Sequence, residues 1–407
     1  MSKTKLPKLE PIRLTQNISL GCDPEFFFAD RRGDVVGSEK VLTGPKDGGL
    51  IIDGVQAEIN PGASSCREGL ASSISNCFIR LNTILQARGN DISLKMDTLI
   101  DISERELNSL SDASRRFGCA PSTNVYNEGK DKTSEIKANP ATYLKRSAGG
   151  HIHLGNYISS YLDKKYAKAL PDGMGDYTRQ HKTAVNLERA LKETPEITVP
   201  ILDIIVGNTC VLLDRQGGNK ERRQNYGRVG EFRIKPYGLE YRTLSNFWLR
   251  SYPLMSLVMS LSRFAVQVVS ESTKENDYVK AFFDAVSRDD IVKAVNENDF
   301  DLAMKNFKAI QPIWLMATNQ GHDSFRPIGS DRMMTAFLHF VSRIQEKGLE
   351  YWFPAETLKH WTGQYNSKGG WENFLTKTVV PDLERWEASQ KAVIDLNKVV
   401  APAPASA

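Results

Sequence analysis

The sequence predicts an α+β fold, with strands in its first half and at mid-chain and helices in its second half. Residues 18–62 contain short apolar stretches that are separated by the turn signals R-R-G-D, G-P-K-D-G-G and D-G. Residues 230–246 alternate like two strands around a P-Y-G turn. From residue 250 onward, apolar side chains recur at three- and four-residue spacing, which is typical of helices. Strands and helices are therefore largely segregated along the chain, which favours the α+β class.

The remaining elements follow in order. Residues 65–89 have helical apolar spacing and end on a glycine, and residues 91–101 contain a further strand. Residues 158–213 read as helical. The stretch "RQGGNKERRQNYGR" at 215–228 reads as a glycine-rich basic loop, which would be either a mobile flap over phosphate or substrate, or a solvated surface loop.

These elements predict the organisation of the domains. We expect an N-terminal extension at 1–17, a core at 18–272, a helical C-terminal region at 273–398 and a disordered tail at 399–407. The apolar run at 253–270 is interrupted by an arginine and several serines, so it predicts a buried helix rather than a membrane span.

Composition excludes some classes of protein. The chain has 53 Lys and Arg against 49 Asp and Glu, a net charge of +4, which is too small to indicate a general nucleic-acid or membrane binder. Five cysteines without C-x-x-C spacing predict free thiols in a reducing compartment. The basic N-terminus has no long apolar run, so we expect no secretory signal and a cytoplasmic location.

One stretch, "AGGHIHLGNY" at 148–157, places two of the six histidines one residue apart. On a strand, His151 and His153 would point to the same face. That arrangement suits a metal or an anion, but for an isolated H-x-H two hydrogen-bonded core histidines are the simpler interpretation. The pair alone does not decide between these interpretations.

Other charged residues also occupy strand contexts where a core normally takes apolar ones. Burying several carboxylates without partners costs several kcal/mol each, so these residues should share counter-ions. Carboxylates with an imidazole suit Mg²⁺ or Mn²⁺, and such a group beside arginines is what phosphoryl transfer needs. The residues are Asp23 and Glu25 in "GCDPEFFF", Glu58 in "GVQAEINP", Glu231, Arg233 and Lys235 in "GEFRIK", and Glu240 and Arg242 in "LEYRTLS".

The motifs "GCDPEF", "DGVQAEINP", "GGHIHLG" and "EFRIKPYGLEYRTLS" occur in this order and resemble the motif series of the phage-type carboxylate–amine ligases (COOH–NH2 ligase type 2). That family lies in the amidoligase branch of the glutamine synthetase and γ-glutamylcysteine synthetase superfamily. The resemblance covers residues 18–250 and implies a glutamine-synthetase-like curved antiparallel sheet with helices on its outer face, plus the mostly helical C-terminal region. It also implies a phage-encoded enzyme of the host cytoplasm. In such an enzyme ATP converts a carboxylate to an acyl phosphate, with Mg²⁺ or Mn²⁺ (two or three ions), and an amine then forms the amide.

The resemblance also implies roles for single residues. Glu240 and Arg242 would be catalytic, with Arg242 stabilising the phosphoryl group in transfer. Arg228, Arg233 and Lys235 would contact the nucleotide phosphates. Asp23 stands where related ligases often have glutamate, which shortens its reach. Asp53 lies five residues before Glu58, the wrong parity for one strand face, so its role depends on the D-G turn. The metal ligands would be Asp23, Glu25, Glu58, His151 or His153, and Glu240.

Two alternatives stay open. A metal-dependent hydrolase or oxygenase could use H-I-H, although no glutamate follows at cupin spacing. A non-enzymatic protein could bind phosphate or nucleic acid through 215–228, against which the near-neutral charge argues. For the ligase we expect small-molecule or peptide carboxylate and amine substrates, no membrane partner, and compatibility with a homo-oligomer. The sequence does not identify the two substrates.

Overall fold

The computed structural model describes residues 9–400 except 11, 13–16, 45, 90, 117–121, 129–132, 135, 137, 141, 157–174, 319–327 and 365–368. Most of the predicted N-terminal extension and residues 401–407 of the predicted tail therefore lie outside the described residues. The two preceding valines, Val399 and Val400, still belong to the last helix, so the predicted tail begins two residues too early.

Antiparallel pairing joins the strands of the described residues into three sheets. The five-stranded sheet has the order β1-β11-β13-β12-β9, with β1 (Ile18–Cys22), β9 (Thr123–Asn124), β11 (Ile152–Asn156), β12 (Glu231–Lys235) and β13 (Gly238–Tyr241). The six-stranded sheet has the order β3-β2-β6-β5-β4 with β7 on β2, and consists of β2 (Glu25–Asp30), β3 (Val35–Val36), β4 (Lys46–Asp47), β5 (Leu50–Asp53), β6 (Gln56–Ile59) and β7 (Ile92–Lys95). The third sheet pairs β8 (Leu99–Asp101) with β10 (Lys145–Ser147).

Helices make up most of the second half, as the sequence predicted. The α-helices are α1 (Arg67–Ala87), α2 (Glu104–Ser109), α3 (Asp112–Arg115), α5 (Gly175–Glu188), α6 (Pro195–Leu202), α7 (Asn208–Leu213), α8 (Asn219–Asn225), α9 (Tyr252–Glu271), α10 (Tyr278–Ala285), α11 (Arg288–Asn296), α12 (Phe300–Thr318), α13 (Asp331–Lys347), α14 (Thr357–Lys359), α15 (Trp371–Phe374) and α16 (Val380–Val400). Short 3₁₀ and π turns are η1 (Ser38–Lys40), η2 (Arg189–Glu193), η3 (Asp203–Gly207), η4 (Asn246–Arg250), η6 (Leu349–Tyr351), η7 (His360–Gln364) and η8 (Leu375–Val379).

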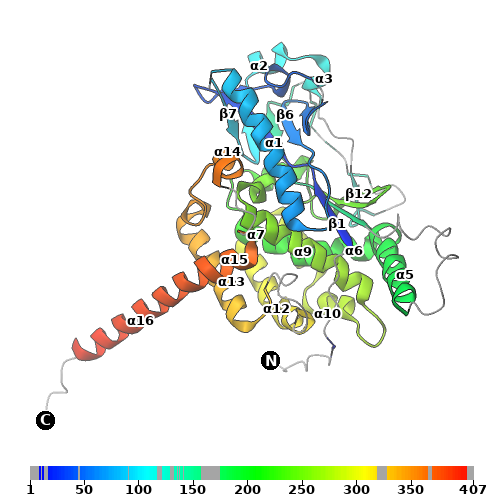
Figure 1. Cartoon of the computed structure of the whole chain (residues 1–407), viewed down its shortest axis with the longest axis vertical. Helices are drawn as coiled ribbons and strands as arrows, with labels where there is room; N and C mark the ends of the chain where they lie inside the picture. Colours follow the sequence, from blue (N-terminus) through cyan, green and yellow to red (C-terminus); the bar gives the residue numbers. More distant parts are fainter. Residues whose placement is uncertain are drawn as a thin grey trace, which may run out of the picture.

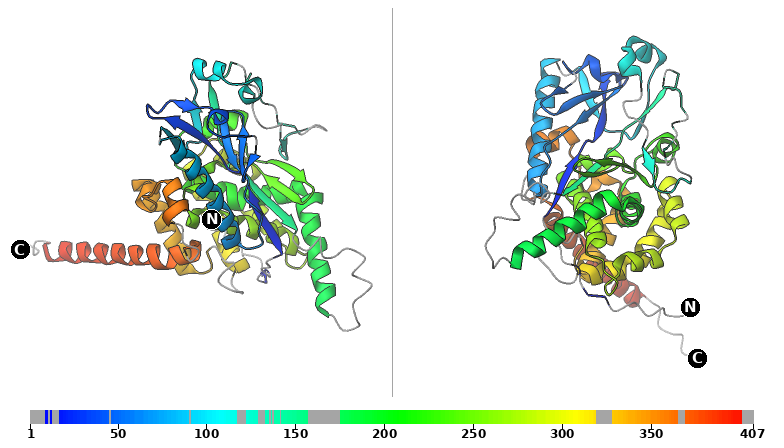
Figure 2. Two further views of the ribbon diagram at one scale, coloured as in Figure 1. Left: turned by 45° about the horizontal axis from the view of Figure 1, so that its top comes forward. Right: turned by 90° about the vertical axis from the view of Figure 1, so that its right-hand side faces the viewer.

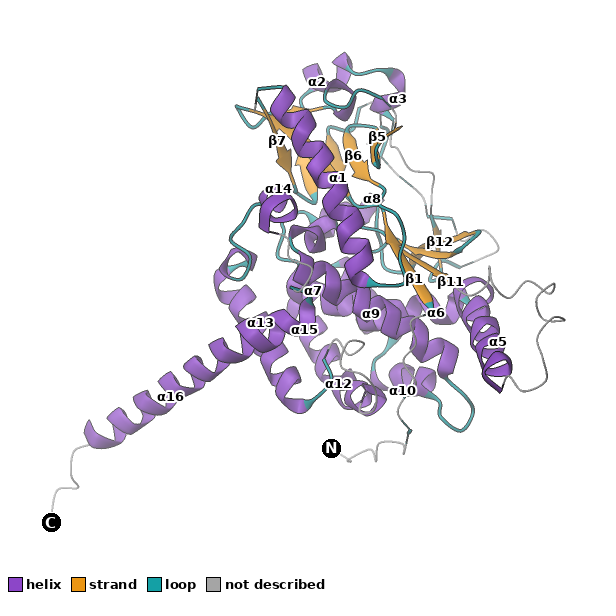
Figure 3. Ribbon diagram, in the orientation of Figure 1, coloured by secondary structure: helices purple, strands orange, loops and turns teal. Residues whose placement is uncertain are grey.

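Strands and helices occupy different parts of the molecule. The six-stranded sheet lies at the top with α1 running along it, the five-stranded sheet lies at mid-height on the right, and most helices of the second half gather below (Figure 3). The last helix, α16, extends away from the body in Figure 1 and in the left view of Figure 2. The predicted α+β class, its antiparallel sheets and its helical C-terminal region are confirmed.

Helix α9 packs against the five-stranded sheet. All of its residues from Tyr252 to Ser270 are buried, and it contacts β1, β11 and α6. Two segments, 195–213 and α9, are long and apolar enough to cross a membrane, but 83% and 100% of their apolar windows are buried inside the protein. They therefore pack as core helices, as predicted for the apolar run at 253–270. The predicted boundary at residue 272 stays a prediction, and buried apolar packing continues across it from Ile12 to Leu383.

The glycine-rich basic stretch at 215–228 differs from its prediction. It contains helix α8, which begins after Gly218, whose φ of 86° only glycine adopts readily. Arg222 and Arg223 of this helix are buried, with 1% and 5% of their surface exposed. The stretch is therefore part helix rather than all loop, and the solvated interpretation is wrong for Arg222 and Arg223, whose side chains pack inward. A mobile flap over phosphate or substrate stays a prediction.

Candidate active site

The register of the five-stranded sheet aligns charged side chains across three strands. His153 on β11 lies opposite Glu240 on β13, and Glu240 lies opposite Arg233 on β12. Directly paired residues in a sheet point to the same face. The intervening Leu154 and Leu239 point to the other face and are fully buried against the helical core. Alternation along each strand thus separates a polar face from an apolar one.

The first acidic group consists of Asp23, His151 and Glu240 and lies on this polar face. Each offers one ligand atom, and the three atoms lie within 4.8 Å of one another. His151 Nδ1 is 3.1 Å from Asp23 Oδ1 and 3.8 Å from Glu240 Oε1. His153 Nε2 lies 3.0 Å from Asp23 Oδ2, so both imidazoles contact the carboxylate of Asp23. We name Asp23, His151, His153 and Glu240 the histidine group.

The second group consists of Glu25, Asp53 and Glu58, whose ligand atoms also lie within 4.8 Å of one another. Glu25 on β2 pairs directly with Glu58 on β6, and Glu58 pairs with Ile51 on β5. Asp53 follows Ile51 by two residues and so shares its face. We name these residues the carboxylate group.

The hairpin of β5 and β6 explains how Asp53 shares a face with Glu58 despite the odd spacing between them. Asp53 and Glu58 do not lie on one strand but on the two arms of a hairpin that turns through Gly54, at φ 69°. The odd spacing is therefore compatible with one shared face. The Oδ2 atom of Asp53 is buried and has no hydrogen-bond partner among the described residues. The structure adds Asp53 to the predicted acids.

Cationic side chains surround Glu240. Arg242 Nη1 donates to Glu240 Oε1, Lys235 Nζ lies 2.7 Å from Oε2, and Arg233 Nη1 lies 3.6 Å from Oε1. Glu240 and Arg242 are almost fully buried, whereas the side chains of Lys235 and Arg233 are 31% and 22% exposed. The predicted catalytic pair and two of the predicted phosphate contacts therefore meet at one carboxylate.

Arg228 lies apart from these cations. Its Nε donates to the carbonyl of Arg223 over 3.1 Å, its Nη2 donates to the carbonyl of Gln224, and its Nη1 is 3.8 Å from Glu231. In this arrangement its guanidinium holds the C-terminal end of α8. A direct contact of Arg228 with nucleotide phosphate stays a prediction.

Burial and neighbouring charge give the two groups different pKa values. Burial would raise the pKa of Asp23, but the imidazoles of His151 and His153 outweigh it and hold the pKa well below its usual range. Burial is likewise outweighed at Glu240 by His151 and Arg242, which lower its pKa to about 2. Burial and Arg242 together lower the pKa of His151 to about 4. The carboxylates of the histidine group are therefore ionised, and the ring of His151 is neutral near neutral pH.

In the carboxylate group the pKa values are raised instead of lowered. Burial and Asp53 raise the pKa of Glu25 to about 8, and burial and Asp23 raise that of Asp53 to about 6. Burial and the surrounding carboxylates, Asp23 first, raise the pKa of Glu58 to about 10. These residues have too little positive charge around them to be ionised together.

Tyr226 connects the two groups, and the sequence analysis did not identify it. Its hydroxyl donates to Glu25 Oε1 over 2.7 Å and lies 2.6 Å from His151 Nε2, and it accepts from Arg242 Nη2 over 3.3 Å. The guanidinium of Arg242 also lies 5.4 Å from the centre of its ring. A tyrosine between a basic stretch and a glycine carries no motif, so only the fold could reveal this position.

The donor set fits divalent cations. Each group combines at least two carboxylates at one point, the histidine group adds a neutral imidazole, and the carboxylate group contains an orphaned buried oxygen of Asp53. Hard oxygen donors with one imidazole are ligands for Mg²⁺ or Mn²⁺.

Residues outside the site have structural contacts. Asp203 on η3 is fully buried and accepts from the Tyr241 hydroxyl over 2.7 Å. His339 lies 2.9 Å from Asp382, and His360 accepts from the Tyr252 amide.

Comparisons with known proteins bear on this site. The family model described as "Phage phiEco32-like COOH.NH2 ligase-type 2" matches residues 193–322, a segment that contains Glu240 and Arg242. The resemblance to this family is thus confirmed over that segment. No curated protein matches the chain. Among solved structures, a bifunctional glutathione synthetase from Pasteurella multocida is similar at 11% identity and a TM-score of 0.45, over 86% of this chain and 52% of that one. The chain spans about half the length of that protein.

Proposed function

We propose that this protein is an ATP-dependent carboxylate–amine ligase that uses divalent cations. The observation that carries the proposal is the meeting of two acidic groups, one on each of the two larger sheets and joined through Tyr226, with Arg242, Arg233 and Lys235 gathered at one carboxylate, Glu240. Groups of this kind suit phosphoryl transfer, in which cations must screen the approach of two anions. The family match over 193–322 supports the same chemistry.

The proposed reaction needs no protein nucleophile. An oxygen of the substrate carboxylate attacks the γ-phosphorus of ATP, and the bond from that phosphorus to the β-phosphate bridge breaks, releasing ADP. The amine then attacks the acyl carbon of the acyl phosphate, the carbon–oxygen bond to phosphate breaks, and inorganic phosphate leaves. The nitrogen gives up one proton to complete the amide, so atoms and charges balance.

The metal-binding residues would be Asp23, Glu240 and His151 or His153 in the histidine group and Glu25, Asp53 and Glu58 in the carboxylate group. Bound Mg²⁺ or Mn²⁺ would supply positive charge beside the phosphate oxygens and the reacting carboxylate.

The protein's own residues then have separate tasks. Arg242, held between Glu240 and Tyr226, presents a guanidinium whose position is constrained on both sides. Arg233 and Lys235 are partly exposed at the edge of the site, which suits contacts with the phosphates of an incoming nucleotide. Glu240 orients all three cations. The proposal extends to a phage-encoded protein that acts in the cytoplasm of an infected cell.

The alternative of a nucleic-acid-binding protein loses its main support. That interpretation used the basic stretch at 215–228, but Arg222 and Arg223 are buried within it. A buried guanidinium cannot contact a phosphate backbone on the surface.

The test is ATP turnover by the purified protein with Mg²⁺ or Mn²⁺ and pooled carboxylates and amines, followed by ³¹P NMR. We expect metal-dependent formation of ADP and phosphate that rises with one carboxylate–amine pair. Absence of ADP, together with absence of metal-dependent nucleotide binding in calorimetry, would reject the ligase.

A further inference from the structure

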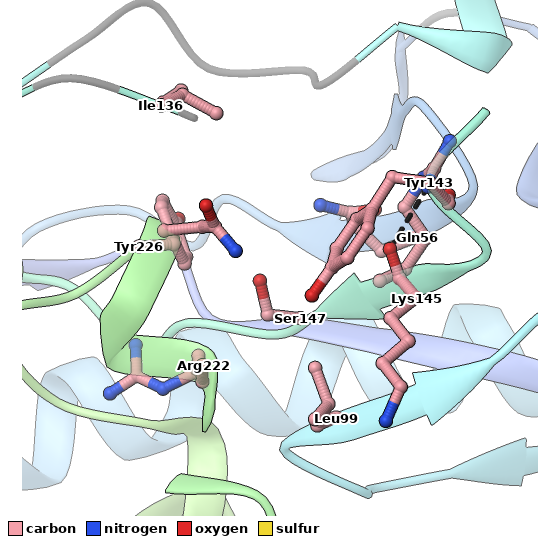
Figure 4. A pocket seen from close by; sticks show the side chains of 10 residues that line it. Gln56, Leu99, Ile136, Tyr143, Lys145, Ser147, Arg222 and Tyr226 are labelled. Atoms are coloured by element: carbon pink, nitrogen blue, oxygen red, sulfur yellow. Dashed lines mark hydrogen bonds between the residues drawn. The ribbon is translucent and has the colours of Figure 1, made fainter. Parts of the chain in front are cut away.

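The structure contains a large pocket that the proposed reaction does not use. The pocket next to Tyr226, which Gln56 of β6 also lines, lies beside the carboxylate group and belongs to the proposed catalytic site (Figure 4). Another pocket is formed by the loop after β9, by α6 and η3, and by the junction of α10 and α11. Its volume is about 380 Å³, which lies within the range of pockets that hold small organic molecules. We name this pocket the rear pocket, and its lining includes Tyr126, Glu196, Ile204, Phe283, Arg288 and Ile291.

Strand alternation places the rear pocket on the opposite side of the five-stranded sheet from Glu240. Tyr241 follows Glu240 on β13 and therefore points to the other face, where its hydroxyl donates to Asp203 over 2.7 Å. Asp203 is the first residue of η3, and the next residue, Ile204, lines the rear pocket. The sheet itself thus separates a molecule in the rear pocket from the acids of the proposed catalytic site.

The interior of the rear pocket is apolar. Ile204, Val286 and Ile291 line it and are buried, with 4%, 7% and 2% of their surface exposed. Phe283 also lines it and is 39% exposed, so an aromatic ring lies at the solvent edge of the pocket. The ring of Tyr126 provides a second aromatic surface. A ligand with an aromatic side chain would cover these surfaces and remove them from water.

Two opposite charges line the same pocket. Glu196 lies in the first turn of α6, and Arg288 begins α11. Within the described part of the chain, neither residue forms an ion pair, so they do not neutralise each other. The guanidinium of Arg288 lies 4.8 Å from the centre of the Tyr126 ring, and its Nη2 donates to the Tyr126 carbonyl over 2.9 Å. These contacts position the guanidinium and leave further N–H groups for an anion.

We propose that the rear pocket binds a free aromatic α-amino acid. The carboxylate of this ligand pairs with Arg288, its ammonium group pairs with Glu196, and its ring fills the apolar interior. A zwitterion carries both charges and the ring in one small molecule, which a simple acid or a simple amine does not. This inference goes beyond the proposed function, because the site lies behind the sheet and its charges come from the chain without metal or nucleotide.

The test measures binding to the full chain by calorimetry, without ATP and without divalent cations. The probes are L-phenylalanine, 3-phenylpropionate, which lacks the amine, phenethylamine, which lacks the carboxylate, and L-alanine, which lacks the ring. We expect L-phenylalanine to bind about fivefold or more tightly than each of the other three, because each of them lacks one of the three contacts.

Two substitutions at exposed positions separate the two charges. Arg288→Gln should remove the advantage of L-phenylalanine over phenethylamine and keep its advantage over 3-phenylpropionate. Glu196→Gln should have the reverse effect. Arg385→Gln and Glu356→Gln, whose side chains are exposed elsewhere on the protein, are the matched controls and should keep both advantages. Because all four side chains lie at the surface, these substitutions leave the core intact.

Three results would overturn the rear pocket as an amino-acid site: equal binding of L-phenylalanine and its two analogues, advantages that persist unchanged in both variants, or no binding of L-phenylalanine at about 10 mM. Binding that disappears in Arg242→Ala but survives in Arg288→Gln would place the amino acid in the catalytic site and would also reject the proposal. Failure of the pocket is distinguishable from failure of the ligase. ATP turnover without binding in the rear pocket rejects only the pocket, and binding without ATP turnover rejects only the ligase.

Discussion

The histidine group and the carboxylate group meet at Tyr226 but differ in how their buried negative charge is compensated. The acids of the histidine group have His151, His153, Arg242 and Lys235 around them, and their pKa values are low. The acids of the carboxylate group have mainly one another, and their pKa values are high. Tyr226, with its hydroxyl between Glu25 and His151, is the bridge between the groups.

This difference shows where an external cation contributes most. The histidine group is already close to neutral through its own side chains, so a cation there must displace or share existing partners. In the carboxylate group a divalent cation would replace protons and relieve mutual repulsion directly. The following predictions would break this comparison or sharpen it.

The largest effect is expected for Glu240→Gln and Arg242→Ala. Each should lower kcat for ATP turnover by about a hundredfold or more, because one charge contact made in the transition state is lost. Steady-state kinetics on folded variants provide the measurement, with Arg385→Gln, at an exposed position of α16, as the control. Near-normal turnover in both variants would remove Glu240 and Arg242 from the catalytic site.

Glu58→Gln should separate metal binding from folding. In the metal-free protein at pH 8, Glu58 must take up a proton on folding because its folded pKa is about 10, and the Gln variant avoids that cost. The Tm at pH 8 should therefore rise by a few degrees, while the increase in Tm caused by Mn²⁺ should largely vanish. Differential scanning calorimetry with and without Mn²⁺ measures both. The exposed Asp284→Asn provides a carboxylate-to-amide control. A wild-type Mn²⁺ response in Glu58→Gln would contradict the assignment.

The pH dependence of stability should have opposite signs in the two groups. Glu58, Glu25 and Asp53 have folded pKa values of about 10, 8 and 6, above their usual values, so the folded state binds more protons than the unfolded chain. The contribution of these three carboxyl groups to the free energy of unfolding is complete at acid pH, and it is lost as pH rises through their folded pKa values of about 6 to 10. Asp23 and Glu240 have lowered pKa values, so the stability that these two carboxylates contribute is lost as pH falls below about 4.

Thermal unfolding of the metal-free protein across pH measures both contributions. The increase in Tm with Mn²⁺ should grow between pH 6 and pH 9, because metal ligands must be deprotonated. A metal response that declines over this range would show that the carboxylate group does not bind the cation.

The smallest effect is expected for Tyr226→Phe, which removes the hydroxyl that joins the groups but keeps the ring against Arg242. We expect kcat to fall by about tenfold, since Glu25 and His151 lose a positioning hydrogen bond while every charge remains. The KM for ATP should stay unchanged. Tyr351→Phe, whose hydroxyl contacts Asp382 on the distant α16, is the matched control.

Much of the site could be predicted from strand alternation. His151 and His153, or Glu240 and Arg242, are two residues apart, and on a β-strand such residues share a face whatever the rest of the fold is. Two features without a period could not be placed from the sequence. The role of Asp53 depended on the hairpin that brings it beside Glu58. The burial of Arg222 and Arg223 in the basic stretch at 215–228 was not predicted, because arginines usually face solvent.

The sequence by itself determined the α+β class, the buried helix at 253–270 and the acids and histidines of the site, because these follow from local periodicity and from the cost of burying charge. Tertiary structure decided which acids meet. Only long-range pairing places Glu25 opposite Glu58 and Tyr226 between Glu25 and His151, at a sequence separation of 201 residues for the Tyr226–Glu25 contact. Only three-dimensional packing buries Arg222 and leaves its Nε and Nη1 without a hydrogen-bond partner among the described residues.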